Sequence, residues 1–404
     1  MGFGQGLSGL NAASQNLDVI GNNIANSGTV GYKSSSTSFA DIYASSRVGL
    51  GVRVSAVNQD FSVGNVSSTG GQYDVAIDGS NGFFRLTDSS GSVFYSRNGQ
   101  FNVDENFNLV NASNGMQVTG YPAGSIGAQP VPLKIPQANI PPQATTSATM
   151  LSNLDANATP ITTAFNATDR TTYTDSVPTT VYDSLGNSHQ LMQYFVKQAP
   201  DAVTGNSVYN IYYTLDGAAV TSPSPNATLQ FDASGTLASA STVTVGIATV
   251  GSTTSPAQPM SIAINYNGTT QYGSDFSPKV TATGYASGDY NGVTIAKDGS
   301  VVANYSNGQT QIVGTIALAR FNNPEGLQPA GNNVWTETPA SGQATLGQPG
   351  TSGLATLQGQ ALEESNVNMS NELVNMIIAQ RTYQANAQTI KTQDQILQTL
   401  MNMA

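Results

Sequence analysis

The stretch IGNNIANSGTVGYK, residues 20–33, places turn-forming residues directly after an apolar helical pattern. Asparagine and glycine tolerate turn and left-handed conformations, and asparagine side chains satisfy backbone groups that a helix end leaves free. The stretch therefore predicts an elbow at which the chain leaves an N-terminal helix. An ordinary capped helix end is compatible with the same pattern. The residues assigned to the elbow are Asn22, Asn23, Asn26, Gly28 and Gly31.

Both ends of the chain carry apolar residues at alternating spacings of three and four. This pattern is typical of a helix with one narrow apolar seam. Ser370 is the expected N-cap of the second helix, with Glu372 in its first turn. The middle of the chain offers no other helical surface, so the seams are expected to meet each other or copies of themselves, although two helices in an ordinary core fit the pattern too. The predicted interface residues are Leu10, Leu17, Ile20, Ile24, Leu373, Met376, Tyr383, Ile390, Leu397 and Met401.

Residues 72–333 favour β-strands. Asn98-Gly99 lies between two alternating runs and predicts a hairpin, and further turns follow an aspartate in VYDSLGNSHQL, LQFDASGTLAS and IAKDGSVVANY. No helical pattern of ten residues intervenes, which argues against parallel βαβ units. The predicted fold class is mainly β with terminal α-helices that pair as a coiled coil.

Proline-rich sequence and a change of composition divide the β region. Six prolines lie between Pro122 and Pro142, and the block that follows is rich in Thr and Ala. The sequence predicts a β domain inserted into another, so that the inner domain is built from two chain segments. The predicted ranges are 1–26 and 362–404 for the helical domain, 27–70 and 357–361 for an extended linker region, 71–145 and 284–356 for the inner β domain, and 146–283 for the inserted outer β domain.

Composition argues against several functions. The net charge of −11, with 13 scattered Lys and Arg in 404 residues, argues against nucleic-acid binding. No cysteine is present, and His189, the only histidine, follows a turn and is expected to be solvated. Asp74 and Asp78 suggest a calcium loop less strongly than a strand that opens into a turn. We expect no enzyme activity, cofactor or metal.

The N-terminus lacks the features of a cleaved signal peptide, and no stretch reaches the length of a membrane helix. We therefore expect no membrane insertion. If the protein leaves the cell, another export route is required.

Several segments resemble the axial proteins of the bacterial flagellum, the rod, hook and hook-associated family. LSGLNAASQNLDVIGNNIANSGTVGYK is similar to the N-terminal signature of the whole family. Other segments resemble the hook members of the family in particular, and the Thr-rich block is not distinctive. These segments are FADIYASSRVGLGVRVSAVNQDFS, GFFRL, SVFYSRNGQFNVDENFNLVN, GNNVWTET and NVNMSNELVNMIIAQRTYQANAQTIKTQDQILQTL.

The resemblance implies a structural subunit of a curved, flexible tube that acts as a universal joint between rod and filament. In such proteins the terminal helices pair and line the inside of the tube. Implied partners are copies of the chain, the distal rod, the hook cap, the hook–filament junction protein and the flagellar type III export gate. The implied location is the extracellular hook on the basal body, reached by export without a cleaved signal. The alternatives are a distal rod or other axial protein and, from another class, a surface adhesin.

The segment FADIY, residues 39–43, is similar to the short export-gate motif of this family. The resemblance implies that Phe39 and Tyr43 contact the export gate. Packing of the two side chains within the subunit explains them equally well.

Overall fold

The computed structural model describes residues 3–42, 49–220, 222–223, 226–248, 250–252 and 255–403. The chain forms two compact units. The first comprises Met1–Gln137, Asn291–Asn304 and Thr310–Ala404, and the second comprises Ala138–Tyr290 and Tyr305–Gln309.

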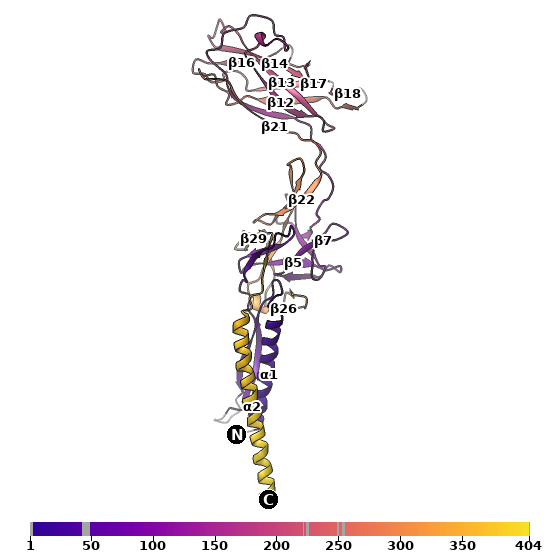
Figure 1. Cartoon of the computed structure of the whole chain (residues 1–404), viewed down its shortest axis with the longest axis vertical. Helices are drawn as coiled ribbons and strands as arrows, with labels where there is room; N and C mark the ends of the chain where they lie inside the picture. The colour runs from indigo at the N-terminus through magenta and orange to yellow at the C-terminus, as the bar shows by residue number, and fades with distance from the viewer. Residues whose placement is uncertain are drawn as a thin grey trace. The chain divides into compact units, whose positions relative to one another are not determined.

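The first unit contains the terminal helices α1 (Phe3–Ala25) and α2 (Met369–Met403). They lie side by side and antiparallel (Figure 1). The N-cap of α2 is Asn368 rather than Ser370, because the Asn368 side chain accepts a hydrogen bond from the backbone N–H of Asn371 at 3.1 Å.

A long antiparallel hairpin packs against α1. Its strands are β1 (Ser35–Ile42) and β2 (Gly51–Gln59), and their register shifts between Ser38 and Phe39. Both strands lie within the range 27–70 that the sequence indicates as linker. The two strands pair with each other along their whole length, so these residues form a β-hairpin on the helix rather than an unpaired linker.

The inner β-structure of the first unit is a large sheet with two small satellite sheets. In the described part of the chain, the sheet follows the order β22-β23-β24-β9-β5-β6-β27-β26, and β7, β8, β10, β25 and β28 pair at its sides. The satellites pair β3 with β30 and β4 with β29. The first group of strands is β3 (Val66–Ser68), β4 (Val75–Asp78), β5 (Phe83–Thr87), β6 (Val93–Ser96), β7 (Phe101–Val103), β8 (Leu109–Asn111), β9 (Gln117–Pro122) and β10 (Val131–Pro132). The second group is β22 (Tyr290–Ile295), β23 (Ser300–Tyr305), β24 (Thr310–Ile316), β25 (Leu318–Arg320), the short 3-10 helix η2 (Pro324–Gly326), β26 (Gln328–Pro329), β27 (Val334–Thr336), β28 (Thr345–Gly347), β29 (Thr356–Gly359) and β30 (Ala361–Glu363).

The core of this unit contains the only tryptophan of the chain. Trp335 is buried, and its ring meets those of Phe61 and Phe83 edge to face at 5.5 and 5.9 Å. The indole N–H donates to Gln59 Oε1 at 2.6 Å. The end of β2 is therefore fixed to the inner sheet.

Asn98-Gly99 does not form the predicted hairpin. Among the described strands, β6 pairs with β5 and β27, whereas β7 pairs with β8. Asn98 is buried and donates to Ser113 Oγ, and Gly99 accepts the backbone N–H of Val75. The dipeptide is a buried turn between two hairpins.

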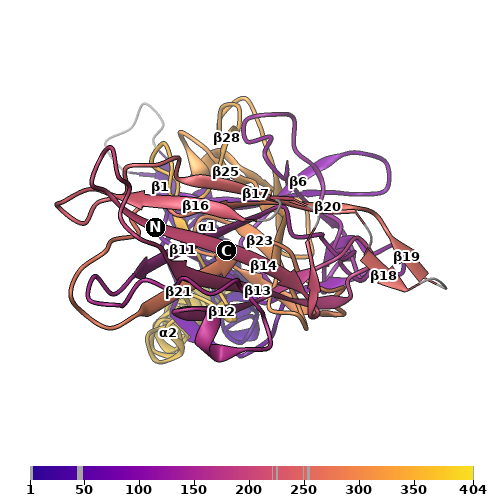
Figure 2. The same ribbon diagram turned by 90° about the horizontal axis from the view of Figure 1, so that it is seen from above.

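The second unit is a sandwich of two β-sheets. In its described part the order of one sheet is β12-β13-β14-β15, with β16 on β14, and that of the other is β17-β20-β11-β21. Side chains of both sheets form one core, and the β18–β19 hairpin projects from its edge (Figure 2). The elements are β11 (Ser147–Asn153), the 3-10 helix η1 (Arg170–Thr172), β12 (Asp175–Tyr182), β13 (Ser188–Lys197), β14 (Ser207–Leu215), β15 (Ala218–Ala219), β16 (Ala227–Phe231), β17 (Thr242–Ile247), β18 (Val250–Ser252), β19 (Ser255–Ala257), β20 (Met260–Asn265) and β21 (Ser277–Ala282).

The chain enters and leaves the second unit through two paired segments. Bridges join Ile140 to Gly288 and Gln143 to Tyr285. A Cβ on Gly284 would lie 2.8 Å from the backbone N of Thr145, so the segments are in contact there. These bridges extend the compact unit beyond the predicted range 146–283.

Candidate assembly interface

The terminal helices approach closely because two glycines of α1 lie against side chains of α2. A Cβ on Gly6 would lie 3.1 Å from Ile390 Cγ1, and one on Gly9 would lie 2.9 Å from Asn386 Oδ1. Ala379 of α2 is also buried. Glycine weakens a helix, but Gly6 and Gly9 have no side chains and so allow α2 to approach α1 closely.

The predicted interface residues divide into a buried, a partly buried and an exposed group. Ile20 is buried. The partly buried residues are Leu10, Leu17, Ile24, Met376 and Ile390. The exposed residues are Leu373, Tyr383, Leu397 and Met401. Only the first two groups are brought together within one chain.

Sequence reasoning missed the small and polar members of the contact. Gly6, Gly9, Ala379 and Asn386 lie where the helices meet, but none of them is a large apolar residue. The spacing of three between the glycines, and of seven between Ala379 and Asn386, was the available signal. A search for large apolar residues at heptad spacing does not detect this spacing of small and polar residues.

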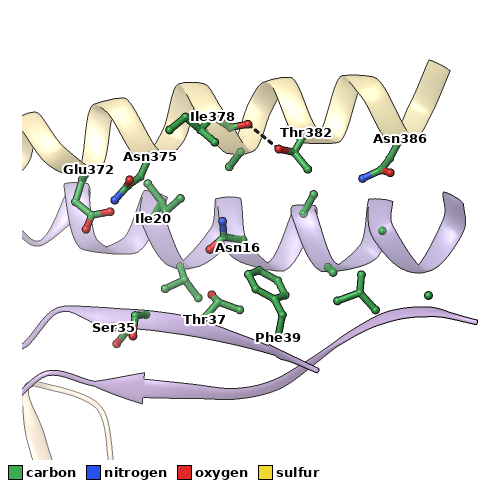
Figure 3. A pocket seen from close by; sticks show the side chains of 18 of the residues that line it. Asn16, Ile20, Ser35, Thr37, Phe39, Glu372, Asn375, Ile378, Thr382 and Asn386 are labelled. Carbon is green, nitrogen blue, oxygen red and sulfur yellow. Dashed lines mark hydrogen bonds between the residues drawn. The ribbon is translucent and has the colours of Figure 1, made fainter. Parts of the chain in front are cut away.

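A groove of about 660 Å³ lies between α1, α2 and the β1–β2 hairpin (Figure 3). Ile20 and Phe39 point into it, from the helix and from the hairpin. Glu372 is the one ionisable residue among its described lining residues, and the rest are apolar or uncharged polar. These include Ala12, Ala13, Val19, Val52, Ile378 and Ala379. Such a lining suits an apolar side chain.

Phe39 of the predicted export motif is one wall of this groove. Its side chain is 49% exposed although it lines the groove, so the chain itself covers only half of it. Tyr43, the other residue of the motif, lies outside the described residues. The structure therefore places Phe39 where packing is available.

Asn23 organises the elbow after α1. It is buried, its Nδ2 donates to the Ser35 carbonyl at 2.8 Å, and its Oδ1 accepts the Ser35 backbone N–H at 2.9 Å. This pair of bonds fixes the start of β1 to the last turns of the helix. Asn22 and Asn26 hydrogen-bond to each other at the surface, from Asn26 Nδ2 to Asn22 Oδ1 at 2.6 Å.

The two elbow glycines differ in how closely other residues surround them. Gly31 has φ of +67°, and a Cβ there would lie 2.7 Å from the backbone of Arg97 and Asn98. Its N–H donates to the Glu363 carbonyl at 2.7 Å. A Cβ on Gly28 would have no neighbour within 4 Å, and nothing in the structure explains a glycine there.

Three charged side chains meet in the interior just beyond the elbow. Lys33 Nζ lies 2.6 Å from Glu363 Oε1, and Arg97 Nη2 lies 2.8 Å from Glu363 Oε2, with all three side chains at most 1% exposed. Arg97 also donates to the carbonyls of Gly82 and Gly79. The cluster joins three segments that are far apart in the sequence.

Burial dominates the electrostatics of this cluster. It lowers the pKa of Lys33 and of Arg97, and the Glu363 carboxylate opposes the change in both. Buried charges without a partner are costly, so Glu363 is essential to both cations.

Two stretches of α2 present large apolar side chains to solvent. Near its start Leu373, Val374, Ile377 and Ile378 are 47 to 58% exposed. At its end Ile396, Leu397 and Met401 are 53 to 76% exposed. Because Gly6 lies against Ile390, the last turns of α2 continue past the N-terminal end of α1 (Figure 1).

Other kinds of site find little support in the described residues. No group of three or more His, Cys, Asp or Glu side chains in that part of the chain is arranged to hold a metal ion. Asp74 accepts a hydrogen bond from Thr69, and Asp78 ends β4 at the surface. Among the described helices, none combines the length and the apolarity that crossing a membrane requires.

Family models of flagellar proteins match successive parts of the sequence. The model described as flagella basal body rod protein matches residues 5–33, and that of the flagellar hook protein FlgE/F/G D1 domain matches residues 76–152. The flagellar basal body protein FlaE D2 domain matches residues 153–285. The flagellar basal body rod FlgEFG protein C-terminal model matches residues 358–403.

Curated relatives match over the whole chain. The sequence is 48% identical over 412 residues to the flagellar hook protein FlgE of Salmonella typhimurium and 49% identical over 416 residues to that of Escherichia coli K12, with 100% of both chains covered in each case. It is 33% identical over 444 residues to flagellar hook protein FlgE of Borreliella burgdorferi, with 98% of each chain covered. The crystal structure of Helicobacter pylori flagellar hook protein FlgE2 matches 74% of this chain and 100% of that chain with a TM-score of 0.56. At 14% identity, this last likeness concerns the fold alone.

Proposed function

This chain belongs to the flagellar hook protein family, and we propose that it polymerises through its terminal helices into the wall of a curved, flexible tube. The tube acts as a universal joint that transmits torque from rod to filament. The protein is a structural subunit in this proposal and catalyses no reaction.

The exposed apolar side chains of α2 carry the proposal. Isolated apolar residues are common on protein surfaces, but clustered ones mark interaction sites. Leu397 and Met401 lie in the part of α2 that continues past α1, so a second copy is the partner that can cover them. Each would then contribute about 1.5 to 3 kcal/mol per subunit.

The groove of Figure 3 is the complementary feature on the same unit. Apart from Glu372, it is lined by apolar and uncharged polar groups, and Phe39 and Ile378 remain about half exposed at its walls. We propose that apolar side chains of neighbouring copies enter it. Assembly would then complete a core that one chain leaves unfinished.

Location and export form the finer part of the proposal. The chain works in the hook outside the cell, and it leaves through the flagellar type III apparatus without a cleaved signal. The distal rod, hook cap and hook–filament junction protein are its proposed neighbours. Glycines such as Gly6 and Gly9 cost α1 about 1 kcal/mol each relative to alanine, which supports an unfolded N-terminus before assembly.

The test is assembly of purified protein followed by electron microscopy. The double variant Leu397→Gln and Met401→Gln keeps good helix formers but removes the apolar side chains, so it should raise the critical concentration for tubes at least tenfold. Removing residues 395–404 should abolish tubes and leave a monomer with native β-structure. The control Asn402→Gln introduces the same residue next to Met401 and should assemble normally. Normal tubes from the truncated chain would overturn the role given to α2.

A further inference from the structure

His189 lies between the carboxylates of two turns in the second unit. Its Nδ1 is 2.7 Å from Asp216 Oδ2, and its Nε2 is 3.3 Å from Asp183 Oδ2. The His189 side chain is 12% exposed, so it is not the solvated group that the sequence indicates. Only a doubly protonated imidazole donates from both nitrogens.

The two carboxylates belong to different turns at one end of the sheet. Asp183 is buried in the β12–β13 turn and accepts the backbone N–H groups of Leu185 and Asn187. Asp216, in the β14–β15 turn, has φ of +49° and accepts the backbone N–H of Gln190 at 2.8 Å. His189 thus connects two turns, each of which also has a hydrogen bond that does not involve the imidazole.

The β12–β13 turn also touches the segments through which the chain enters and leaves this unit. A Cβ on Gly186 would lie 2.7 Å from Pro142 Cβ and 3.4 Å from the Ser287 backbone N. Next to the turn, Thr145 donates its backbone N–H to the Tyr182 carbonyl at 2.9 Å. A change in this turn therefore reaches both connecting segments.

We propose that His189 is a proton-dependent clip. When protonated it ties the Asp183 carboxylate of the β12–β13 turn to the Asp216 carboxylate of the β14–β15 turn and helps to keep the former turn packed on the connecting segments. Loss of one proton removes the hydrogen bond to one of the two carboxylates, whereas the β14–β15 turn stays bonded to the backbone N–H of Gln190. This device is independent of the polymerisation proposed above.

The electrostatic surroundings agree with the geometry. Burial alone would lower the pKa of His189, but hydrogen bonds to Asp216 and Asp183 outweigh it and raise that pKa above its usual value. The titratable groups that face the imidazole from the packed elements are these two aspartates. Burial would raise their own pKa values, but backbone hydrogen bonds and His189 lower them.

The sign of the pH effect follows from linkage. A raised folded-state pKa means that the contribution of His189 is complete below the unfolded value of about 6.5 and is lost as pH rises through the folded value. The aspartates contribute above about 3.9 and lose their contribution as pH falls through their lowered values. The contribution of the clip to stability is therefore complete between about pH 4 and 6.5, and the clip opens only as the pH rises through the raised pKa of His189.

One measurement exploits the single histidine of the chain. In full-length protein labelled at histidine carbon, the one imidazole resonance should titrate above pH 6.5, and Asp216→Asn should move the midpoint down. The control Asp232→Asn alters a similar aspartate turn that contains no histidine and should leave the midpoint in place. A midpoint at or below 6.5 in the unaltered protein would overturn the proposal.

Hydrogen exchange gives the structural readout. After correction for intrinsic rates, residues 140–145 and 183–187 should exchange faster at pH 8.5 than at pH 6, with up to a tenfold change in opening equilibrium for each unit of raised pKa. His189→Gln should remove this pH dependence. The exchange rate of these residues in the variant can be fast or slow, but it should be the same at both pH values after the correction. An unchanged pH dependence in His189→Gln would show that another group is responsible.

Discussion

Lys33 and Glu363 are separated by 330 positions in the sequence, yet Lys33 Nζ lies 2.6 Å from Glu363 Oε1 and neither side chain is exposed. The contact closes the first unit, because it joins the segment that leaves α1 to the strand that precedes α2. Arg97 binds the other oxygen of the same carboxylate.

Replacing the shared carboxylate should strongly destabilise the first unit. Glu363→Gln leaves two buried cations without a counter-charge, which should cost about 3 to 5 kcal/mol of unfolding free energy. Denaturant unfolding followed by Trp335 fluorescence measures the loss in this unit. The adjacent exposed residue gives the control, since Glu364→Gln should change stability by less than about 0.5 kcal/mol. Similar losses in both variants would contradict the role of the cluster.

The elbow glycines should respond differently to alanine. Gly31→Ala places a Cβ against backbone atoms at positive φ, so it should cost about 2 kcal/mol or more. Gly28→Ala adds a methyl group in open space and should be neutral within about 0.5 kcal/mol. Thermal unfolding of both variants measures the difference. Equal stability of Gly31→Ala and Gly28→Ala would contradict the close contact between Gly31 and the backbone of Arg97.

Phe39→Ala separates packing from export. If Phe39 serves as a groove wall, the variant should be secreted normally but should form fewer or unstable tubes. If the export gate reads it, the protein should instead accumulate in the cytoplasm. Val57→Ala is a matched control, because Val57 is 52% exposed on the same hairpin but does not line this groove. Quantifying secreted and retained protein, with electron microscopy of the secreted fraction, decides between them.

The inserted unit should be removable. Thr145 and Gly284 are in contact, so a short Gly/Ser linker can replace residues 146–283 without moving either end. Trp335 lies in the first unit, and its emission and unfolding midpoint should be unchanged in the shortened chain. We expect tubes that have lost their regular curvature. Red-shifted Trp335 emission would mean that residues 146–283 belong to the same core as the rest.

The sequence predicts local turns better than strand partners. Asp183 and Asp232 open hairpin turns as their patterns indicate, because an aspartate that accepts nearby backbone N–H groups acts within a few residues. Asn98-Gly99 has the strongest hairpin signal but forms none, because β6 pairs instead with β27, more than 230 residues away. A local pattern carries no information on that competition.

The same limit applies to the assembly interface. Heptad spacing predicts both terminal helices, but it does not distinguish the side chains that face α1 from those that face solvent. Ile20 is buried and Leu397 is exposed, although both fit the pattern. The missing information is the close approach at Gly6 and Gly9, which sets the rotation of α2 and leaves its larger side chains outside.

The meeting of Thr145 and Gly284 makes this chain a natural scaffold for display. Any foreign domain whose own termini lie side by side should fit between these two positions, because the bridges at Ile140 and Gln143 already hold the flanking segments together. Copies of such a guest would then be carried at regular intervals along a self-assembling fibre.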